Sequence, residues 1–202
     1  MILLKEITNA NIWKVCALEP FEEQKDFVAE NIQSLAEAYA TRNEGGNALP
    51  LAVYDDAELI GFVMIGKGTV GNEDESELIR ENYSIWRLMI DKRFQGQGFG
   101  RQTLDAAMER IRAFPYGEAK KVWLSDEPEN TRAREIYRKY GFVENGEMCG
   151  GEIVAVEQEI KLVALGEPRT TTAANGSIVY DLSALNMADY RAFLVFATVD
   201  AA

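Results

Sequence analysis

Three glycines, Gly96, Gly98 and Gly100, stand at alternate positions where an apolar run ends and a helical pattern begins. The stretch reads IDKRFQGQGFGRQTLDAA over residues 90–107. Because glycine has no Cβ, its backbone can adopt left-handed conformations and lie close to a ligand. The unpaired N–H groups and the dipole at a helix N-terminus favour an anion. The junction therefore predicts a phosphate-binding site, with a merely flexible turn as the alternative.

The residues around these glycines narrow the kind of phosphate site. Arg93 and Arg101 bracket the turn, where they could pair with phosphates. The G-x-G-x-G spacing differs from the G-x-G-x-x-G fingerprint of dinucleotide-binding folds, and no Gly-Lys-Ser/Thr follows as in a P-loop. The sequence therefore predicts phosphate binding outside these two nucleotide-binding classes.

The spacing of apolar residues predicts an α/β (α+β) chain with a mixed central sheet flanked by helices. Strands are expected over 2–7, 51–54, 59–65, 83–90 and 120–126, and a final hairpin over 142–162 that turns at Gly150 and Gly151. Helices are expected over 9–18, 22–40, 100–114 and 130–141. Loops are expected over 43–50 and, with many acidic residues, over 71–81.

The composition changes after Lys161, where GEPRTTTAANGS over 166–177 predicts a linker. We expect a main domain over residues 1–163 and a C-terminal extension over residues 164–202, built as strand, short helix and strand. The extension carries the apolar string YRAFLVFATV over 190–199, which would be an aggregation-prone edge if left uncovered. This predicts a homodimer or a higher homo-oligomer.

The charge balance and the absence of histidine exclude several function classes. The net charge is −12, which argues against a nucleic-acid partner and is compatible with a cationic small molecule. With no histidine in the chain, Ser–His and Cys–His nucleophile pairs and His-ligated zinc are excluded. Proton chemistry must then use carboxylates, tyrosine, cysteine, lysine, water or the backbone.

The two cysteines and the apolar runs indicate the cellular location of the protein. Cys16 and Cys149 are far apart and show no metal-ligand spacing, so we expect a reduced chain without a metal site. The N-terminal run MILLKEITNANIW is too short for a signal peptide, and no stretch approaches the roughly 20 apolar residues of a membrane span. We expect a cytoplasmic protein that does not bind membranes.

Two motifs resemble the GNAT superfamily of N-acetyltransferases. The stretch RFQGQG at 93–98 is similar to the family's R-x-x-G-x-G/A pyrophosphate loop. The stretch ENTRAREIYRKYGF at 129–142 resembles its N-x-x-A-x-x-x-Y-x-x-x-G-F segment, with Asn130 and Tyr137 in place. The resemblance covers residues 1–162 and implies the family's mixed sheet with flanking helices. It also implies an acetyltransferase that uses acetyl-CoA as the acetyl donor.

The resemblance implies which residues bind acetyl-CoA. The amides of the loop would wrap the pyrophosphate, and the strand before the loop would pair its backbone with the pantetheine arm. Asn130 would hold that arm, with a plain helix N-cap as the alternative or additional role. The implied pyrophosphate residues are Arg93, Gln95, Gly96, Gln97, Gly98, Phe99, Gly100 and Arg101, and the implied strand residues are Leu88, Met89 and Ile90.

The resemblance also implies the chemistry of acetyl transfer. Tyr137 is similar to the family tyrosine that protonates the departing CoA sulfur, with aromatic packing as the alternative role. The backbone N–H of Leu88 or Met89 would stabilise the tetrahedral oxyanion. Polyamine acetyltransferases of the superfamily can carry a glutamate in the middle of the strand before the loop, where this chain has Trp86 beside Arg87. The general base therefore stays open, with carboxylates reached through water as candidates.

The stretches EEQKDFVAENIQSLAEAYA at 22–40 and PLAVYDDAELIGFVM at 50–64 resemble bacterial spermine/spermidine acetyltransferases, which implies a polyamine acceptor. Glu37, on the second expected helix, would bind a substrate ammonium, or would be an ordinary exposed helix residue. Glu75 in the acidic loop would attract the same charge, and Trp86 would form an apolar wall. An aminoglycoside, a peptide or protein amine, and a non-catalytic acyl-CoA-binding module are the alternatives.

Overall fold

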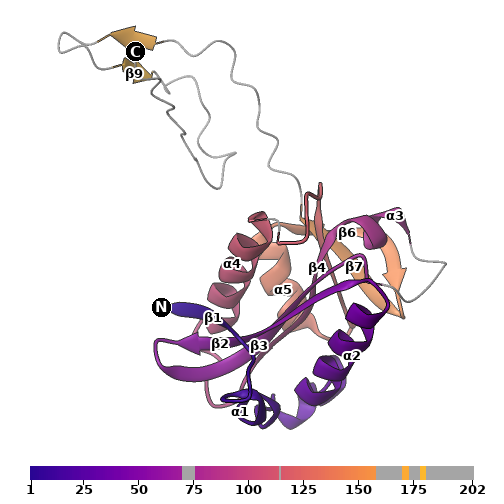
Figure 1. Ribbon diagram of the computed structural model, residues 1–202. Coiled ribbons are helices and arrows are strands. Elements are labelled where there is room, and N and C mark those ends of the chain that lie inside the picture. The colour runs from indigo at the N-terminus through magenta and orange to yellow at the C-terminus, as the bar shows by residue number, and fades with distance from the viewer. Residues whose placement is uncertain (70–75, 114, 158–169, 173–177, 181–202) are drawn as a thin grey trace. The chain divides into compact units, whose positions relative to one another are not determined.

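Seven strands form one mixed sheet in the order β1-β2-β3-β4-β5-β7-β6 (Figure 1). The computed structural model describes residues 1–69, 76–113, 115–157, 170–172 and 178–180. The strands are β1 (Ile2–Glu6), β2 (Asn47–Asp55), β3 (Glu58–Lys67), β4 (Tyr83–Ile90), β5 (Val122–Asp126), β6 (Phe142–Cys149) and β7 (Glu152–Glu157). Neighbouring strands are antiparallel except β4 and β5, which are parallel. The predicted mixed sheet is confirmed.

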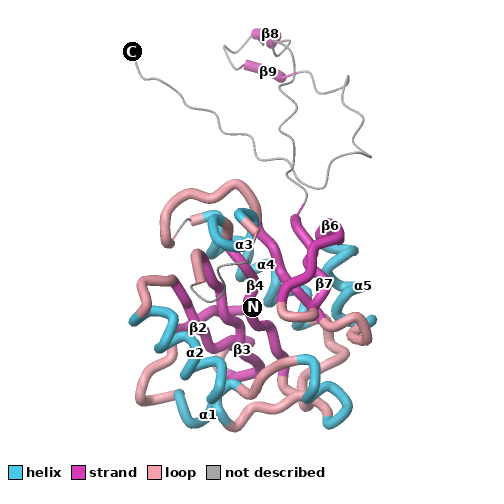
Figure 2. The backbone as a smooth tube through the Cα atoms, turned by 90° about the vertical axis from the view of Figure 1, so that its right-hand side faces the viewer, coloured by secondary structure: helices cyan, strands magenta, loops and turns pink. Residues whose placement is uncertain are grey.

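Helices cover both faces of this sheet. They are α1 (Ile12–Cys16), the 3₁₀ helix η1 (Glu22–Phe27), α2 (Asn31–Asn43), α3 (Glu77–Glu81), α4 (Phe99–Arg112) and α5 (Thr131–Tyr140). Helix α2 packs on β2, whereas α5 packs on β6 (Figure 2). Within the part of the chain that the structure describes, no helix is long and apolar enough to cross a membrane.

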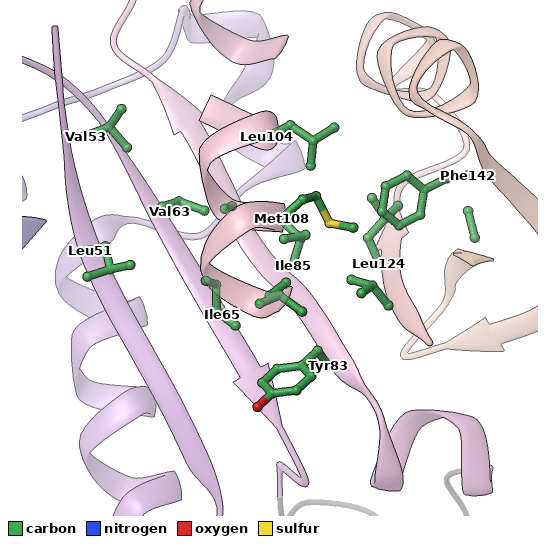
Figure 3. Packing of buried hydrophobic residues seen from close by; sticks show 14 of the residues in the cluster. Leu51, Val53, Val63, Ile65, Tyr83, Ile85, Leu104, Met108, Leu124 and Phe142 are labelled. Atoms are coloured by element: carbon green, nitrogen blue, oxygen red, sulfur yellow. The ribbon is translucent and has the colours of Figure 1, made fainter. Parts of the chain in front are cut away.

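Alternate residues of the strands pack into separate hydrophobic clusters on the two faces of the sheet. Leu104 and Met108 of α4 pack with one set of strand residues, which Figure 3 shows around them. That set includes Leu51, Val53, Val63, Ile65, Ile85 and Leu124. The residues between them on the strands pack with α1 and α2, and include Ala52, Phe62 and Met64. Because successive side chains of a strand point to opposite faces, α4 and α1–α2 cover opposite faces.

Strands β4 and β5 diverge soon after they begin. Their parallel pairing consists of Tyr83 with Val122 and Ser84 with Trp123, and no later residue of β4 pairs with β5. On its other side β4 pairs with β3 up to Ile90. The register shifts there so that Trp86 is an extra residue, a β-bulge that bends the strand. A wedge therefore opens between the second half of β4 and the end of β5.

Several boundaries predicted from the sequence are wrong for identifiable reasons. The helix expected over 22–40 is interrupted, because Val28 is extended and buried Asn31 starts α2, where its Nδ2 donates to Val15 O at 2.8 Å. The loop expected over 43–50 ends early, because β2 begins at Asn47. Pro50 is tolerated because β2 pairs with β1 only from Leu51 onward. The second half of the predicted acidic loop forms α3.

The C-terminal part is a separate unit. The chain divides into two compact units, Met1–Glu159 and Ile160–Ala202. In the second, β8 (Thr170–Thr172) pairs antiparallel with β9 (Ile178–Tyr180). Strand β8 lies inside the predicted linker, so that part of the linker prediction is wrong. The apolar string over 190–199 and the boundary at residue 163 lie outside the described residues and stay predictions.

Candidate active site

A cavity of about 500 Å³ occupies the wedge between β4 and β5. The whole second half of β4 forms one wall, and the ends of β5 and β7 form the facing wall. The loop before α4, the first turns of α5 and the segment from η1 to α2 complete the lining. The cavity therefore joins the glycine-rich loop to the motif that carries Asn130 and Tyr137.

The glycine-rich loop has the geometry of an anion cradle. Gly96 and Gly98 have φ values of +80° and +83°, which a residue with a Cβ adopts only under strain. A Cβ at Gly96 or Gly100 would meet no atom within 4 Å, so the backbone there faces open space. Gly98 is the N-cap of α4, and no side chain caps this helix. The N–H groups of the first turn can therefore bind a phosphate.

Most of the predicted cofactor-binding residues line the cavity. They are Leu88, Met89, Ile90, Gln95, Gly96, Gly98, Phe99, Gly100, Arg101 and Asn130. Arg93 and Gln97 are not part of the lining. The Arg93 guanidinium instead donates from Nε to Oδ1 of buried Asp91 at 2.7 Å. Arg132, which the sequence analysis missed, lines the cavity from the first turn of α5 and has no ion-pair partner among the described residues.

Tyr137 lies in the cavity wall with its ring packed edge-on against Phe142, at 6.2 Å between centroids. Its hydroxyl makes no hydrogen bond to the described residues. Burial raises the pKa of Tyr137, and the negative charges of Asp126 and Glu152 raise it further. The hydroxyl therefore keeps its proton at neutral pH and can donate it.

Asn130 is the N-cap of α5, since its side-chain Oδ1 accepts from Ala133 N at 3.4 Å. The same residue lines the cavity. The capping role is therefore present in the structure, beside the position expected for contact with a pantetheine arm.

Two carboxylates at the ends of β5 and β7 were not predicted as site residues. Asp126 is 7% exposed, and its Oδ1 accepts no hydrogen bond from the described residues, although Arg134 Nε lies 3.6 Å away. Burial raises the pKa of Asp126 to about 6, against the opposing effect of Arg134. Glu152 accepts a 2.5 Å hydrogen bond from Ser125 Oγ. Ser125, Asp126 and Glu152 all line the cavity.

The predicted substrate residues are distributed differently from expectation. Trp86 lines the cavity, and the Arg87 guanidinium lies over its ring at 5.6 Å. Glu37 does not line the cavity, because its Oε2 lies 3.1 Å from Arg87 Nη2 and its Oε1 accepts from Gln33. Its proposed contact with a substrate ammonium would have to displace Arg87. Glu75 lies outside the described residues.

Comparison with known proteins places these features in a family. The family model described as "Acetyltransferase (GNAT) family" matches residues 10–142. The spermine/spermidine N(1)-acetyltransferase of Bacillus subtilis strain 168 is 29% identical over 160 residues, which cover 78% of this chain and 98% of that protein. Within the described residues, no group of three or more acidic or cysteine side chains is suited to a metal ion.

Solved structures show the same fold. An aminoglycoside acetyltransferase in complex with coenzyme A has a TM-score of 0.64 and 18% identity over 79% of this chain and 95% of that one. The spermidine N-acetyltransferase of Vibrio cholerae, in complex with CoA and spermine, has a TM-score of 0.53 and 20% identity over 77% of this chain and 92% of that one. The GNAT-like fold expected from the sequence is confirmed.

We predict that Gly98→Asp weakens CoA binding by at least tenfold, because it places a Cβ and a negative charge at the phosphate cradle. Gly45→Asp is the matched control, since Gly45 also has a positive φ and open space around its Cβ but lies outside the cavity. Calorimetric titration of both folded variants with CoA measures the effect. Equal CoA affinities for the two variants would show that the loop is not part of the CoA-binding site.

We predict that ionisation of Asp126 destabilises the folded protein. Its pKa rises from about 3.9 in the unfolded chain to about 6 in the fold. Stability is therefore favoured below the unfolded value and is lost as the pH rises through about 6. Relative to Asp126→Asn, which cannot ionise, the wild type should lose about 2–3 kcal/mol between pH 4 and pH 7.5. Urea unfolding at both pH values measures this, and a pH-independent difference would contradict it.

Proposed function

Because this chain belongs to the GNAT family of acetyltransferases, we propose that it moves acetyl from acetyl-CoA directly to a primary amine of a polyamine such as spermidine or spermine. Its membership of the family makes it an acetyl-CoA-dependent acyltransferase. The observation that carries the proposed acceptor is the chemistry of the cavity. A phosphate cradle, a protonated tyrosine and the carboxylates of Asp26, Asp126 and Glu152 line the same space.

The two ends of the cavity suit the two substrates. At one end, the amides of Gly98 to Arg101 and the side chains of Arg101 and Arg132 would hold the pyrophosphate of acetyl-CoA. The edge of β4 that faces the wedge would pair with the pantetheine arm, and Asn130 would hold the arm from α5. The carboxylates of Asp126 and Glu152 in the wall opposite β4 would attract an ammonium group.

Acetyl-CoA supplies a thioester that is broken when the amine attacks it. In our proposal Tyr137 protonates the departing sulfur, because it lines the cavity and its raised pKa means that the phenol carries its proton at neutral pH. The backbone N–H of Leu88 or Met89 would stabilise the oxyanion. No covalent acetyl-enzyme is required, since donor and acceptor meet in one cavity.

A polyamine is favoured over the other acceptors by charge and by the B. subtilis relative. That relative is named a spermine/spermidine N(1)-acetyltransferase and aligns along 98% of its own length. The net charge of −12 and the cavity carboxylates favour a cation with more than one charge. Trp86 offers an apolar wall for the methylene segments of such a chain.

The homo-oligomer predicted from the extension over 164–202 stays a prediction, as does the cytoplasmic location. The apolar string YRAFLVFATV lies outside the described residues. Comparing the oligomeric mass of the full chain with that of a variant ending at Leu165 would test the predicted homo-oligomer.

We predict that acetyl-CoA turnover is fastest with polyamines. The panel is spermidine, spermine, putrescine, an aminoglycoside and an amino acid, and the readout is thiol release at fixed ionic strength. We expect kcat/KM for a polyamine to exceed that for the other amines by at least tenfold and to fall as salt screens the attraction. An aminoglycoside or amino acid preferred over every polyamine would overturn the proposed acceptor. CoA binding with no turnover would support a non-catalytic module.

We predict that Tyr137→Phe keeps CoA affinity and lowers kcat by about 10²- to 10⁴-fold, the usual contribution of a general acid. Tyr140→Phe is the control, because Tyr140 lies on the same helix but outside the cavity. Steady-state kinetics and CoA titration measure both variants. A Tyr137→Phe rate within about threefold of wild type corresponds to under 1 kcal/mol and would exclude the acid role.

A further inference from the structure

The proposed reaction lacks a group that takes a proton from the acceptor. An alkyl ammonium has a pKa near 10.4, so at neutral pH it must lose a proton before its nitrogen can attack. We propose that Glu152, held in place by Ser125, binds the reacting ammonium and accepts this proton. This inference rests on the proposed amine acceptor, but not on that amine being a polyamine.

The strand register places Ser125 on the sheet face opposite α4. Leu124 packs in the core with α4, so its neighbour Ser125 points the other way. Ser125 pairs with Val154 of β7, and side chains of paired residues lie on the same face. Glu152 stands two residues before Val154 and therefore shares that face.

The facing wall of the wedge presents Trp86 on this same face. Trp86 packs with the cluster that contains Val15 of α1 and Ala38 of α2. Both Trp86 and Glu152 line the cavity. This face, covered by α1 and α2 over β2 to β4 and by α3 over β5 and β7, thus offers an aromatic wall on β4 and a carboxylate on β7. The phosphate cradle lies at the start of α4, on the other face.

The contacts of Glu152 fix its carboxylate in position and leave it able to bind a cation. Oε2 accepts the hydrogen bond from Ser125, which fixes the carboxylate in the wall. In the described residues, Oε1 accepts no hydrogen bond, and no Lys or Arg lies within ion-pair distance of either oxygen. Glu152 and Tyr137 line the same cavity, and the negative charge of Glu152 contributes to the raised pKa of Tyr137.

The other carboxylates near the cavity are less suited to this step. Asp126 is on the α4 face and has Arg134 Nε at 3.6 Å. Glu37 is on the acceptor side, but it is paired with Arg87 and does not line the cavity. Asp26 lines the cavity but is exposed to solvent. Glu152 is the carboxylate that combines cavity lining, a fixing hydrogen bond and no cation partner in the described part of the chain.

The proton and bond changes balance with these two residues. Glu152 takes one proton from the ammonium and later releases it to solvent. The amine nitrogen forms a C–N bond to the acetyl carbon, and the C–S bond of the thioester breaks. Tyr137 gives its proton to the sulfur and is reprotonated by the second proton that leaves the nitrogen. The products are the N-acetyl amine, CoA as the thiol, and one proton in solution.

The test compares Glu152→Gln with Glu147→Gln in the full chain, using the amine of the panel that the wild type acetylates fastest. Glu147 is a matched control, because its Oε2 also accepts a serine hydrogen bond, from Ser76 at 2.6 Å, outside the cavity. We expect Glu152→Gln to lower kcat/KM at pH 7 by about 10²- to 10⁴-fold. Glu147→Gln should stay within twofold of wild type.

The pH profile separates proton transfer from simple charge attraction. Without the proton acceptor, only amine already deprotonated in solution reacts, so the defect of Glu152→Gln should shrink about tenfold per pH unit between pH 7 and 9. Calorimetry gives a readout without turnover: the amine should bind the Glu152→Gln protein–CoA complex several-fold more weakly, with CoA affinity unchanged. A defect that is constant with pH would make Glu152 a charge-binding residue only and would overturn the proton role.

The remaining outcomes are also decisive. A wild type that acetylates another amine but no polyamine would overturn the proposed acceptor and leave this inference to be judged on that amine. If the wild type is active and kcat/KM of Glu152→Gln is within threefold of the wild-type value, the role of Glu152 is overturned but the proposed function is not. No turnover of any amine would overturn both.

Discussion

The parallel pairing of β4 with β5 ends after two residue pairs, and the site depends on that early divergence. Hydrogen bonds hold the start of β4 and the segment before β5 together. Lys67 Nζ donates to the carbonyls of Tyr116, Gly117 and Glu118, at 2.8–3.2 Å, in the segment before β5. Tyr83 OH, at the start of β4, donates to Gly117 O at 2.9 Å. Because one end of the pair is fixed by these bonds, the strands can separate at the other end without losing their register.

The wedge also explains how one sheet could bind both substrates of the proposed reaction. The unpaired backbone of β4 faces the wedge, and the N-terminus of α4 lies on the face where α4 packs. The opposite face of the same strands carries Trp86, with α1 and α2 behind it. The β-bulge at Trp86 belongs to this arrangement, since an extra residue re-aims the side chains that follow it. In the proposed reaction, donor and acceptor would therefore approach the same point from opposite faces.

Features encoded within short stretches could be predicted from the sequence. The glycine loop needs only a strand end, glycines and a helix start, all within residues 90–107. Asn130 and Tyr137 are seven residues apart on one helix, so their common face follows from helical geometry. The strand over 83–90 and the hairpin turn at Gly150 and Gly151 were likewise predictable from local patterns.

Features that depend on contacts between distant segments could not be predicted. Arg93 pairs with Asp91 rather than facing the cavity, because Asp91 is buried and needs a partner. Glu37 is paired with Arg87, fifty residues away, which the helical pattern could not reveal. The alternation in EIVAVE fixed which residues share a face with Glu152, but only the register with β5 places that face beside Ser125. Glu152 was therefore not named as a candidate base from the sequence.

A crystal structure of the protein with CoA and a bound amine would test the central claim most directly. The account predicts that the CoA sulfur lies within about 3.5 Å of Tyr137 Oη and that the pyrophosphate contacts the amides after Gly98. It also predicts the amine nitrogen within hydrogen-bond distance of Glu152, on the Trp86 side of β4. An amine bound on the α4 face, or CoA outside the wedge between β4 and β5, would contradict the account.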